Sequence, residues 1–443
     1  MAPPGGFASD LSPFASDAGP RPGERAGAMA RGLVGSEILR IAADIRALRR
    51  AGRAICDLTV GDFDPRQFRI PERLRSAIVA ALERGETNYP PSNGVPELRE
   101  SVRRAYARDL GLDYPLECVL IAGGARPLLY GTFRALVDPG ERVVYPVPSW
   151  NNNHYVHLVG AHGIAVPCEA ASGFLPTADD VARHLEGARL VCLNSPLNPS
   201  GTSFDPGVLR GICGALLEEN RARERRGERP AYLLYDQVYW MLQASGRTHV
   251  TPPGLVPESA RWTILVDGIS KAFAATGLRV GWALGPADVI ERMSAVLGHV
   301  GAWAPRAEQV ASAEMLDDSE AVREYLAGFQ AAVLARLRRL HRGLAEMRAE
   351  GLAVDALEPA GTIYLAARIH PFGRRTAQGS VLATSEDVRR WLLEEAALAI
   401  VPFQAFGVTR DEGWFRLSVG AVGEREIDEA LPRLAVALRA LRP

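Results

Sequence analysis

The stretch that decides the fold is residues 263–279, which read TILVDGISKAFAATGLR. It opens with an apolar run, residues 263–266, of the length and composition of a buried strand. A few residues later it carries Lys271; the 51 Lys+Arg side chains include this one lysine, so 50 are arginines. An arginine can replace a lysine in surface charge and ion pairs, but a guanidinium remains protonated and cannot act as an amine nucleophile. The surviving lysine therefore predicts amine chemistry, against the alternative of one surface lysine left by chance.

Outward from this stretch, short apolar runs alternate with helical patterns from about residue 63 to 300. The runs lie at 119–122, 143–145, 190–193, 232–235, 263–266 and 280–284. Strands that alternate with helices form βαβ units around a mainly parallel sheet, which binds ligands at the carboxyl ends of its strands. The residues that follow the runs are Gly123 to Arg126, Pro148 to Trp150, Asn194 to Asn198, Asp236, and Ser270 with Lys271. The sequence thus predicts an α/β fold with one site at this edge of the sheet.

The rest of the chain predicts a second, smaller α+β domain. After residue 300 come helical patterns at 321–350 and 386–397, strand-like runs at 362–369 and 415–419, and a closing helix. We expect a disordered tail at 1–32, a segment of the small domain at 33–62 with an amphipathic pattern at 36–50, a large domain at 63–315, and the rest of the small domain at 316–443. The charged stretch 218–229 predicts a solvated surface loop.

Composition excludes several classes of function. A formal net charge of −1 and a pI near 6.7 give no basic surface for nucleic acid or for an anionic membrane. The chain has neither an apolar segment of about 18 residues nor the pattern of a signal peptide, so we expect no membrane span. Five cysteines without a CxxC pair predict free thiols in a reducing compartment, and hence a cytoplasmic protein.

Several motifs in a fixed order carry a resemblance to a known family. They are NYP at 88–90, GVPELR at 94–99, NSPLNPSG at 194–201, DQVY at 236–239, SK at 270–271, TGLR at 276–279 and FRLS at 415–418. Together they resemble fold-type I pyridoxal-phosphate (PLP) enzymes, and within these the class I and II aminotransferases of the aspartate aminotransferase type. The resemblance covers roughly residues 33–440. It implies a PLP-dependent transferase fold and an enzyme that moves an amino group between an amino acid and a 2-oxo acid through a Schiff base on Lys271.

The resemblance also implies roles for the residues around that lysine. The freed amine of Lys271 would carry a proton between the substrate α-carbon and the cofactor. Asp236 would pair with the pyridine nitrogen and keep it protonated. Tyr239 and Asn198 would hydrogen-bond the cofactor's 3′ oxygen. Taken singly, an Asp at a strand end is more often a helix cap, and a tyrosine or a turn asparagine is more often structural.

The phosphate group would be held by a second set of residues. Arg279 resembles the family arginine that binds the phosphate, and Ser270 belongs to the same set. The segment Gly124, Ala125 and Arg126 resembles the loop that offers backbone amides at a helix N-terminus. Trp150 would stack on the pyridine ring, although a tryptophan is more often a core residue. Tyr89 resembles the tyrosine that reaches the neighbouring subunit's phosphate, which would make the protein a homodimer with shared sites.

The substrate contacts follow from the same resemblance. Arg416 would bind the α-carboxylate bidentately, with Gly61, Asn198 and Trp150 beside it. The side chain of Arg126 would bind a distal carboxylate and favour aspartate or glutamate. Arg306 is the other candidate for that carboxylate, with an ion pair at the dimer interface as its alternative role.

Two departures from the family pattern leave the substrate open. The stretch PFQAFG at 402–407 places the bulky Phe403 near the expected substrate mouth, and the run 151–155 is unusually polar and aromatic. Rival functions also remain. A PLP-dependent lyase, cyclase or oxidase could use the same carbanion. A nucleotide-binding oxidoreductase would need a Gly-x-Gly-x-x-Gly motif that is missing after the first strand, and a cofactor-sensing regulator would need a DNA-binding module that residues 1–32 are too short to supply.

Overall fold

The computed structural model describes residues 26–33, 37–244 and 246–443. The chain forms two compact units, Met1–Gly35 and Ser36–Pro443. In the first unit, α1 (Ala28–Gly32) is a single short helix with no buried residue. Most of the predicted disordered tail falls on residues 1–25, which lie outside the described residues. All the other elements belong to the second unit.

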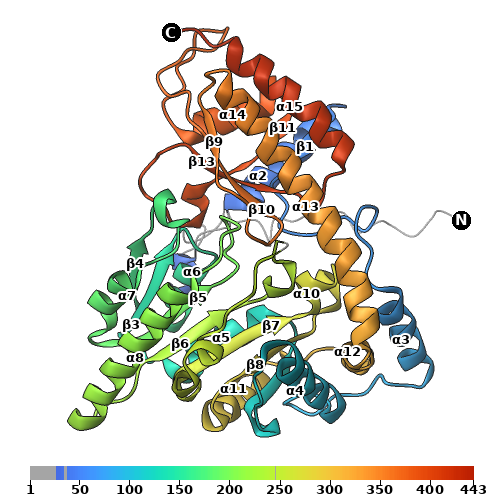
Figure 1. The fold of residues 1–443 in the computed structure, drawn as a ribbon, viewed down its shortest axis with the longest axis vertical. Helices are drawn as coiled ribbons and strands as arrows, with labels where there is room; N and C mark the ends of the chain where they lie inside the picture. Colours follow the sequence, from blue (N-terminus) through green and yellow to red (C-terminus); the bar gives the residue numbers. More distant parts are fainter. Residues whose placement is uncertain (1–25, 34–36, 245) are drawn as a thin grey trace, which may run out of the picture. The chain divides into compact units, whose positions relative to one another are not determined.

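A seven-stranded sheet forms the larger part of that unit (Figure 1). Its strands are β2 (Val119–Ala122), β3 (Arg142–Val147), β4 (His162–Pro167), β5 (Ala188–Asn194), β6 (Tyr232–Asp236), β7 (Thr263–Gly268) and β8 (Gly281–Leu284), in the order β2-β8-β7-β6-β5-β3-β4. Only β8 runs antiparallel to its neighbours, β2 and β7. The predicted α/β fold with a mainly parallel sheet is therefore confirmed.

Helices cover both faces of the sheet because successive strand residues point to opposite sides. In β6, Tyr232 and Leu234 pack into one core with α5 (Ala125–Leu136), α6 (Asn152–Val159) and α11 (Ala287–His299). Leu233 and Tyr235 pack into a second core on the other face. The helices of that core are α4 (Pro96–Leu110), α7 (Ala178–Leu185), α8 (Pro206–Arg226) and α12 (Arg306–Asp317), and α3 (Glu72–Glu83) packs on α12.

A smaller antiparallel sheet has the order β12 (Val401–Pro402), β13 (Trp414–Ser418), β10 (Tyr364–Ile369) and β9 (Val354–Ala356). It shares a separate core with α13 (Ser319–Ala349), α14 (Ser385–Glu395) and α15 (Glu424–Arg439). Near the N-terminus, α2 (Glu37–Arg50) precedes β1 (Cys56–Asp57), which pairs in parallel with β11 (Leu398–Ala399). The two ends of the chain thus build this part together, although the domain boundaries at 62 and 315 stay a prediction.

The charged stretch at 218–229 is not the surface loop that its composition predicted. Helix α8 continues through it to Arg226 and ends at Gly227, whose φ of 69° suits a glycine. Strong helix formers fill the stretch, and Arg223 is buried, where it pairs with Glu219 and donates to the carbonyl of Leu185. The charges therefore stabilise a helix instead of solvating a loop.

Two global features complete the fold. All five cysteines are free, and four of them are buried, which raises the pKa of Cys56 to about 12. Among the described helices, none has the length and apolar character needed to cross a membrane.

Candidate active site

The site lies where the central strands end. Asn194 and Asp236 are the last residues of neighbouring parallel strands, and the Asn194 side-chain amide donates to the Asp236 carbonyl at 2.8 Å. The next strand, β7, leads into the short helix α10 (Ile269–Ala272), which carries Lys271. The sheet thereby brings an amine and a carboxylate to one edge, as the strand-end rule predicted.

The amine of Lys271 is held by a backbone carbonyl and not by a carboxylate. Its Nζ donates to the carbonyl of Gly61 at 2.7 Å and lies 5.9 Å and 5.7 Å from the ring centroids of Phe63 and Tyr239. Within the described part of the chain, it forms no ion pair with a carboxylate. A primary amine in this setting is oriented but free to react with a carbonyl compound.

Asp236 is a carboxylate that forms no ion pair among the described residues. Its Oδ1 accepts from the backbone N–H of Val238 at 3.2 Å. Burial raises the pKa of Asp236 to about 6, against the lowering effects of the Val238 hydrogen bond and of the charge on Lys271. A protonated pyridine nitrogen would relieve this penalty, because an opposite charge favours the ionised carboxylate.

The start of α5 forms a cradle for an anion. Gly124 caps the helix with φ 94° and no capping side chain, so the first N–H groups of the helix are available. Arg279 donates to the carbonyls of Thr276 at 2.7 Å and Gly123 at 2.9 Å. A Cβ at Gly124 would overlap the Arg279 guanidinium and displace it, and the positive φ also favours glycine here. Burial, together with the neighbouring charge of Arg126, lowers the pKa of Arg279, which is the environment that a phosphate would stabilise.

Two further arginines lack an acidic partner among the described residues. The guanidinium of Arg126 lies 5.3 Å from the ring centroid of Trp150, which is half-buried at the end of the loop after β3. Arg416 is only 1% exposed and donates to Asn198 Oδ1 at 3.2 Å and to the carbonyl of Thr59 at 2.6 Å. Its buried Nε has no hydrogen-bond partner, so the guanidinium keeps one donor that the described residues do not use.

Residues 59–62 pass over the site as a strap. The carbonyls of Thr59, Val60 and Gly61 accept from Arg416, Ser418 Oγ and Lys271 respectively. Asp62 accepts from Thr276 Oγ1 at 2.5 Å. The strap therefore orients both the amine and the buried arginine through its backbone, which local sequence patterns could not predict.

Tyr364 is the site residue that the sequence did not reveal. Its hydroxyl lies 2.8 Å from that of Tyr239, and its ring lies 4.5 Å from the Arg416 guanidinium carbon. Tyr364 starts β10 in the small sheet, 125 residues beyond Tyr239. The sequence shows only that a tyrosine stands in a strand-like run. The pairing of this strand with the FRLS strand, and its register, are visible only in the fold.

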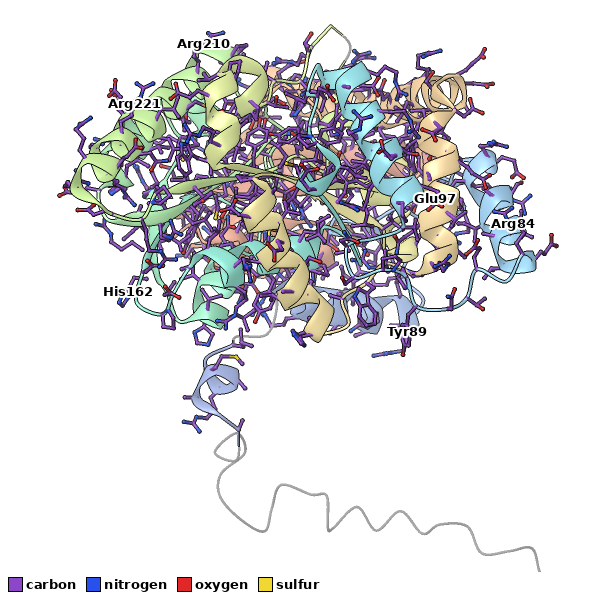
Figure 2. The ribbon with its side chains drawn as sticks, turned by 90° about the horizontal axis from the view of Figure 1, so that it is seen from below. Arg84, Tyr89, Glu97, His162, Arg210 and Arg221 are labelled. Carbon is purple, nitrogen blue, oxygen red and sulfur yellow. The ribbon has the colours of Figure 1, made fainter. Side chains whose placement is uncertain are left out.

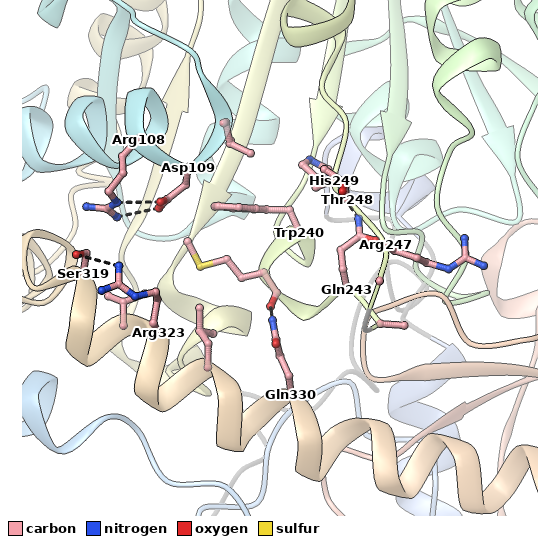
Figure 3. A pocket seen from close by; sticks show the side chains of 16 residues that line it. Arg108, Asp109, Trp240, Gln243, Arg247, Thr248, His249, Ser319, Arg323 and Gln330 are labelled. Carbon is pink, nitrogen blue, oxygen red and sulfur yellow. Dashed lines mark hydrogen bonds and ion pairs between the residues drawn. The ribbon is translucent and has the colours of Figure 1, made fainter.

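The segment after Tyr239 is anchored from its other side. The indole N–H of Trp240 donates to Asp267 at 2.6 Å, and His249 lies 3.3 Å from both Gln243 and Gln237. Burial lowers the pKa of His249 to about 3, so this histidine is neutral. Figure 3 shows Trp240, Gln243 and His249 in the lining of a pocket of about 440 Å³, of which Lys271 is not a lining residue. These contacts fix the backbone that presents Tyr239.

Three predicted positions lie elsewhere or serve another contact. Tyr89 is 80% exposed, edge-on to Trp303 at 5.3 Å, and points outward in Figure 2. Arg306 donates to Glu86 at 2.5 Å, an ion pair within its own chain. Among the described residues the side chain of Ser270 forms no hydrogen bond, and its carbonyl accepts from the backbone N–H of Ala275.

The expectation for Phe403 is wrong. Its side chain is 1% exposed and packs edge-on against Phe174 at 4.9 Å and beside Trp414, so it does not narrow the mouth of the site. The apolar ring gains more from this aromatic cluster than from an open polar cleft. Of the run 151–155, Asn151 has φ 65° and precedes α6, and Tyr155 is buried.

The comparisons with known proteins decide the family. The family "Aminotransferase class I and II" matches residues 53–434. The chain belongs to this family. An aspartate aminotransferase of Rhizobium meliloti (strain 1021) is 34% identical over 91% of this chain and 93% of its own length. A probable aspartate/prephenate aminotransferase of Thermus aquaticus is 32% identical over 90% and 96%.

Solved structures agree with this assignment. The crystal structure of the aspartate aminotransferase from Rhizobium meliloti superposes with a TM-score of 0.86 at 32% identity, covering 95% of this chain and 100% of that one. The Thermus thermophilus aspartate aminotransferase with maleate gives 0.82 at 28% identity, covering 93% and 99%. The predicted family, the PLP-dependent transferase fold and the aminotransferase activity are confirmed, and the oxidoreductase and regulator alternatives are set aside.

Proposed function

We propose that this aminotransferase holds pyridoxal 5′-phosphate on Lys271 and moves an amino group between an acidic amino acid and a 2-oxo acid. The observation that carries the proposal is the amine of the chain's only lysine, oriented by one backbone carbonyl and paired with no carboxylate in the described chain. Around it lie Arg126, Arg279 and Arg416, likewise free of acidic partners there. Such a site is built for a ligand with several negative charges.

The residues present fit the cofactor at each of its groups. The N-terminus of α5 and Arg279 would bind the phosphate. Asp236 would pair with the ring nitrogen, and Trp150 would cover the ring face. Asn198 and Tyr239 would hydrogen-bond the 3′ oxygen. When bound, the cofactor supplies an aldehyde and an electron-accepting ring.

The protein's own groups then bind the substrate and move its proton. Arg416 would bind the α-carboxylate, beside Asn198 and Gly61, because its guanidinium keeps an unused donor and forms no ion pair among the described residues. The freed Nζ of Lys271 would take the proton from the substrate α-carbon and pass it to the cofactor. The carbonyl of Gly61, 2.7 Å from Nζ, would keep the amine oriented for that task.

We extend the proposal to the acidic substrate through Arg126. Its guanidinium stands over Trp150 without a carboxylate partner in the described residues, so a distal carboxylate could bind there. The names of the relatives above, aspartate and aspartate/prephenate aminotransferase, support an acidic amino acid. Phe403 no longer argues against it, because that side chain is buried.

The assembly and location follow as further parts of the proposal. The strongly exposed Tyr89 would complete the phosphate site of a second copy, which makes a two-fold homodimer the working unit. Free, mostly buried thiols favour a reducing cytoplasm.

A half-reaction tests the central claim. The holoenzyme mixed with aspartate or glutamate should lose the absorbance band of the aldehyde form of the cofactor and gain that of the amine form. A 2-oxo acid should then reverse the change. A lyase would release ammonia, an oxidase would consume oxygen, and a cyclase would expel a leaving group from the substrate side chain, each without this reversible conversion. Such a result would refute the proposal.

A further inference from the structure

Tyr364 touches three working parts of the site at once. Its hydroxyl lies 2.8 Å from the hydroxyl of Tyr239, and its ring packs 4.5 Å from the Arg416 guanidinium carbon. A Cβ at Gly61 would lie 2.8 Å from the same hydroxyl, so the strap that holds Lys271 also passes against Tyr364. The side chain is 1% exposed, and its backbone N–H is fixed by Thr362 Oγ1 at 2.9 Å.

The two facing phenols carry one proton each, and either can donate to the other. If Tyr239 donates to Tyr364, the O–H of Tyr239 is occupied by a protein partner and cannot donate to a ligand. If Tyr364 donates to Tyr239, then Tyr239 keeps its proton for an acceptor in the site. A donor that also accepts a hydrogen bond is polarised and donates more strongly. Donation from Tyr364 to Tyr239 is therefore the direction that would let Tyr239 donate to the cofactor's 3′ oxygen.

The position of Arg416 favours that direction. Arg416 pairs with Ala366 on the neighbouring strand, so it is a diagonal neighbour of Tyr364 on one face of the small sheet. A guanidinium over the ring draws electron density from the phenol and makes its O–H a better donor. Tyr364 therefore lies between the arginine proposed for the substrate carboxylate and the tyrosine proposed for the cofactor.

We infer that Tyr364 is a positioning residue, which rests on the proposed function: its hydroxyl donates to Tyr239 and directs the Tyr239 proton toward the cofactor's 3′ oxygen, while its ring holds Arg416. Tyr364 itself would touch neither the cofactor's reacting atoms nor the transferred nitrogen. Its effect should pass entirely through Tyr239 and Arg416.

A double-mutant cycle on the holoenzyme tests this inference, with Tyr364→Phe, Tyr239→Phe and the double variant. The readout is the pH midpoint of the absorbance band of the bound cofactor. Tyr364→Phe should raise the midpoint by about 0.5–1 pH unit, or about threefold to tenfold in proton affinity, because a less well hydrogen-bonded anionic oxygen holds the nearby proton more tightly. In the Tyr239→Phe background the same change should add nothing.

The matched control is Tyr235→Phe, which removes a buried phenol that donates to the carbonyl of Val250 at 2.9 Å. It should lower the melting temperature about as much as Tyr364→Phe and leave the midpoint unchanged. Turnover should also distinguish the two variants. Tyr364→Phe should lower kcat while the KM of the amino acid stays within about twofold, since the ring over Arg416 remains.

Three results would overturn the inference. They are an unchanged midpoint in Tyr364→Phe, an equal shift with and without Tyr239, and a Tyr364→Phe protein that fails to fold while Tyr239→Phe folds, which would assign the hydroxyl to the fold. The proposed function fails differently, because the wild-type holoenzyme would then show no reversible conversion with an amino acid and a 2-oxo acid.

Discussion

Replacing Asp236 by asparagine should abolish most of the transfer activity and, at the same time, stabilise the protein without its cofactor. Asparagine has nearly the shape of aspartate and can still accept the hydrogen bond from Val238 through Oδ1. The substitution therefore removes one negative charge and little else. Opposite effects on activity and stability are the mark of a group that is strained for function.

The loss of activity follows from the charge. An ion pair at about 4 Å in an effective dielectric of about 20 is worth about 4 kcal/mol. If half or more of that energy appears only as the ring accepts electrons, kcat/KM should fall by about thirtyfold to a thousandfold. Asp236→Ala should fall by several orders of magnitude, because it also leaves a cavity beside the ring.

The gain in stability follows from the pKa. Burial raises the pKa of Asp236 from 3.8 to about 6, roughly two pH units or about 3 kcal/mol. Because the folded-state pKa is the higher one, the folded protein binds more protons between these values, and its stability falls as the pH rises through that window. Asp236→Asn should therefore match the wild type near pH 4 and exceed it by up to about 3 kcal/mol at pH 8.

Two measurements check both effects. Stopped-flow half-reactions with glutamate give the transfer rate, and thermal denaturation of the cofactor-free protein at pH 5 and pH 8 gives the stability difference. The matched control is Asp267→Asn at the end of the next strand, where a buried carboxyl accepts from Tyr106, Trp240 and Gly268. Burial raises the pKa of Asp267 as well, to about 7, so the control is read in transfer and not in stability. That variant should keep transfer within about tenfold. Near-native transfer in Asp236→Asn, or equal losses in both variants, would refute the pairing role.

The remaining predictions concern the amine, the substrate and the phosphate. Borohydride reduction should fix the cofactor on the peptide that contains Lys271, and Lys271→Arg should fold but be inactive, so full turnover in that variant would contradict the assignment. Arg126→Ala should lower kcat/KM for aspartate and glutamate by at least about tenfold and spare neutral amino acids, with Arg126→Lys intermediate; equal losses would remove the basis for an acidic substrate. Gly124→Ala should weaken cofactor affinity by at least about tenfold in an absorbance titration, because its Cβ would displace Arg279, whereas Gly214→Ala, which meets open space, should not.

Most of the fold could be predicted because buried parallel strands are short apolar runs. The run at 119–122 coincides with β2, and the run at 232–235 ends one residue before β6 does. The edge strand β4 gave little signal because most of its side chains are exposed. The stretch at 218–229 misled because charge alone does not separate a solvated loop from an amphipathic helix.

The residues of the site likewise fall into those that the sequence could predict and those that it could not. Asp236 and Lys271 could be predicted, since each follows a strand and the ends of parallel strands meet at one edge. Tyr364 could not, and Gly61 was expected beside the substrate from the family resemblance but not as the acceptor of the Lys271 amine. These contacts join residues 125 and 210 positions apart in the chain. Phe403 was misplaced for a related reason: its partner Phe174 lies in a distant segment, and packing between them decides where the ring points.

The replacement of lysine by arginine has a consequence for the chemistry of the whole site. Arg126, Arg279 and Arg416 are its proposed anion-binding groups, and none is paired with an acid in the described part of the chain, whereas Arg306 is paired with Glu86. Guanidinium groups do not lose their proton at any working pH, so this half of the site has the same charge throughout. A pH dependence of transfer is therefore expected from groups other than these three arginines, among them the carboxyl of Asp236, whose pKa burial raises to about 6. A site with lysines in place of the three arginines would mix the titration of binding with that of catalysis, and the arginines keep the two apart.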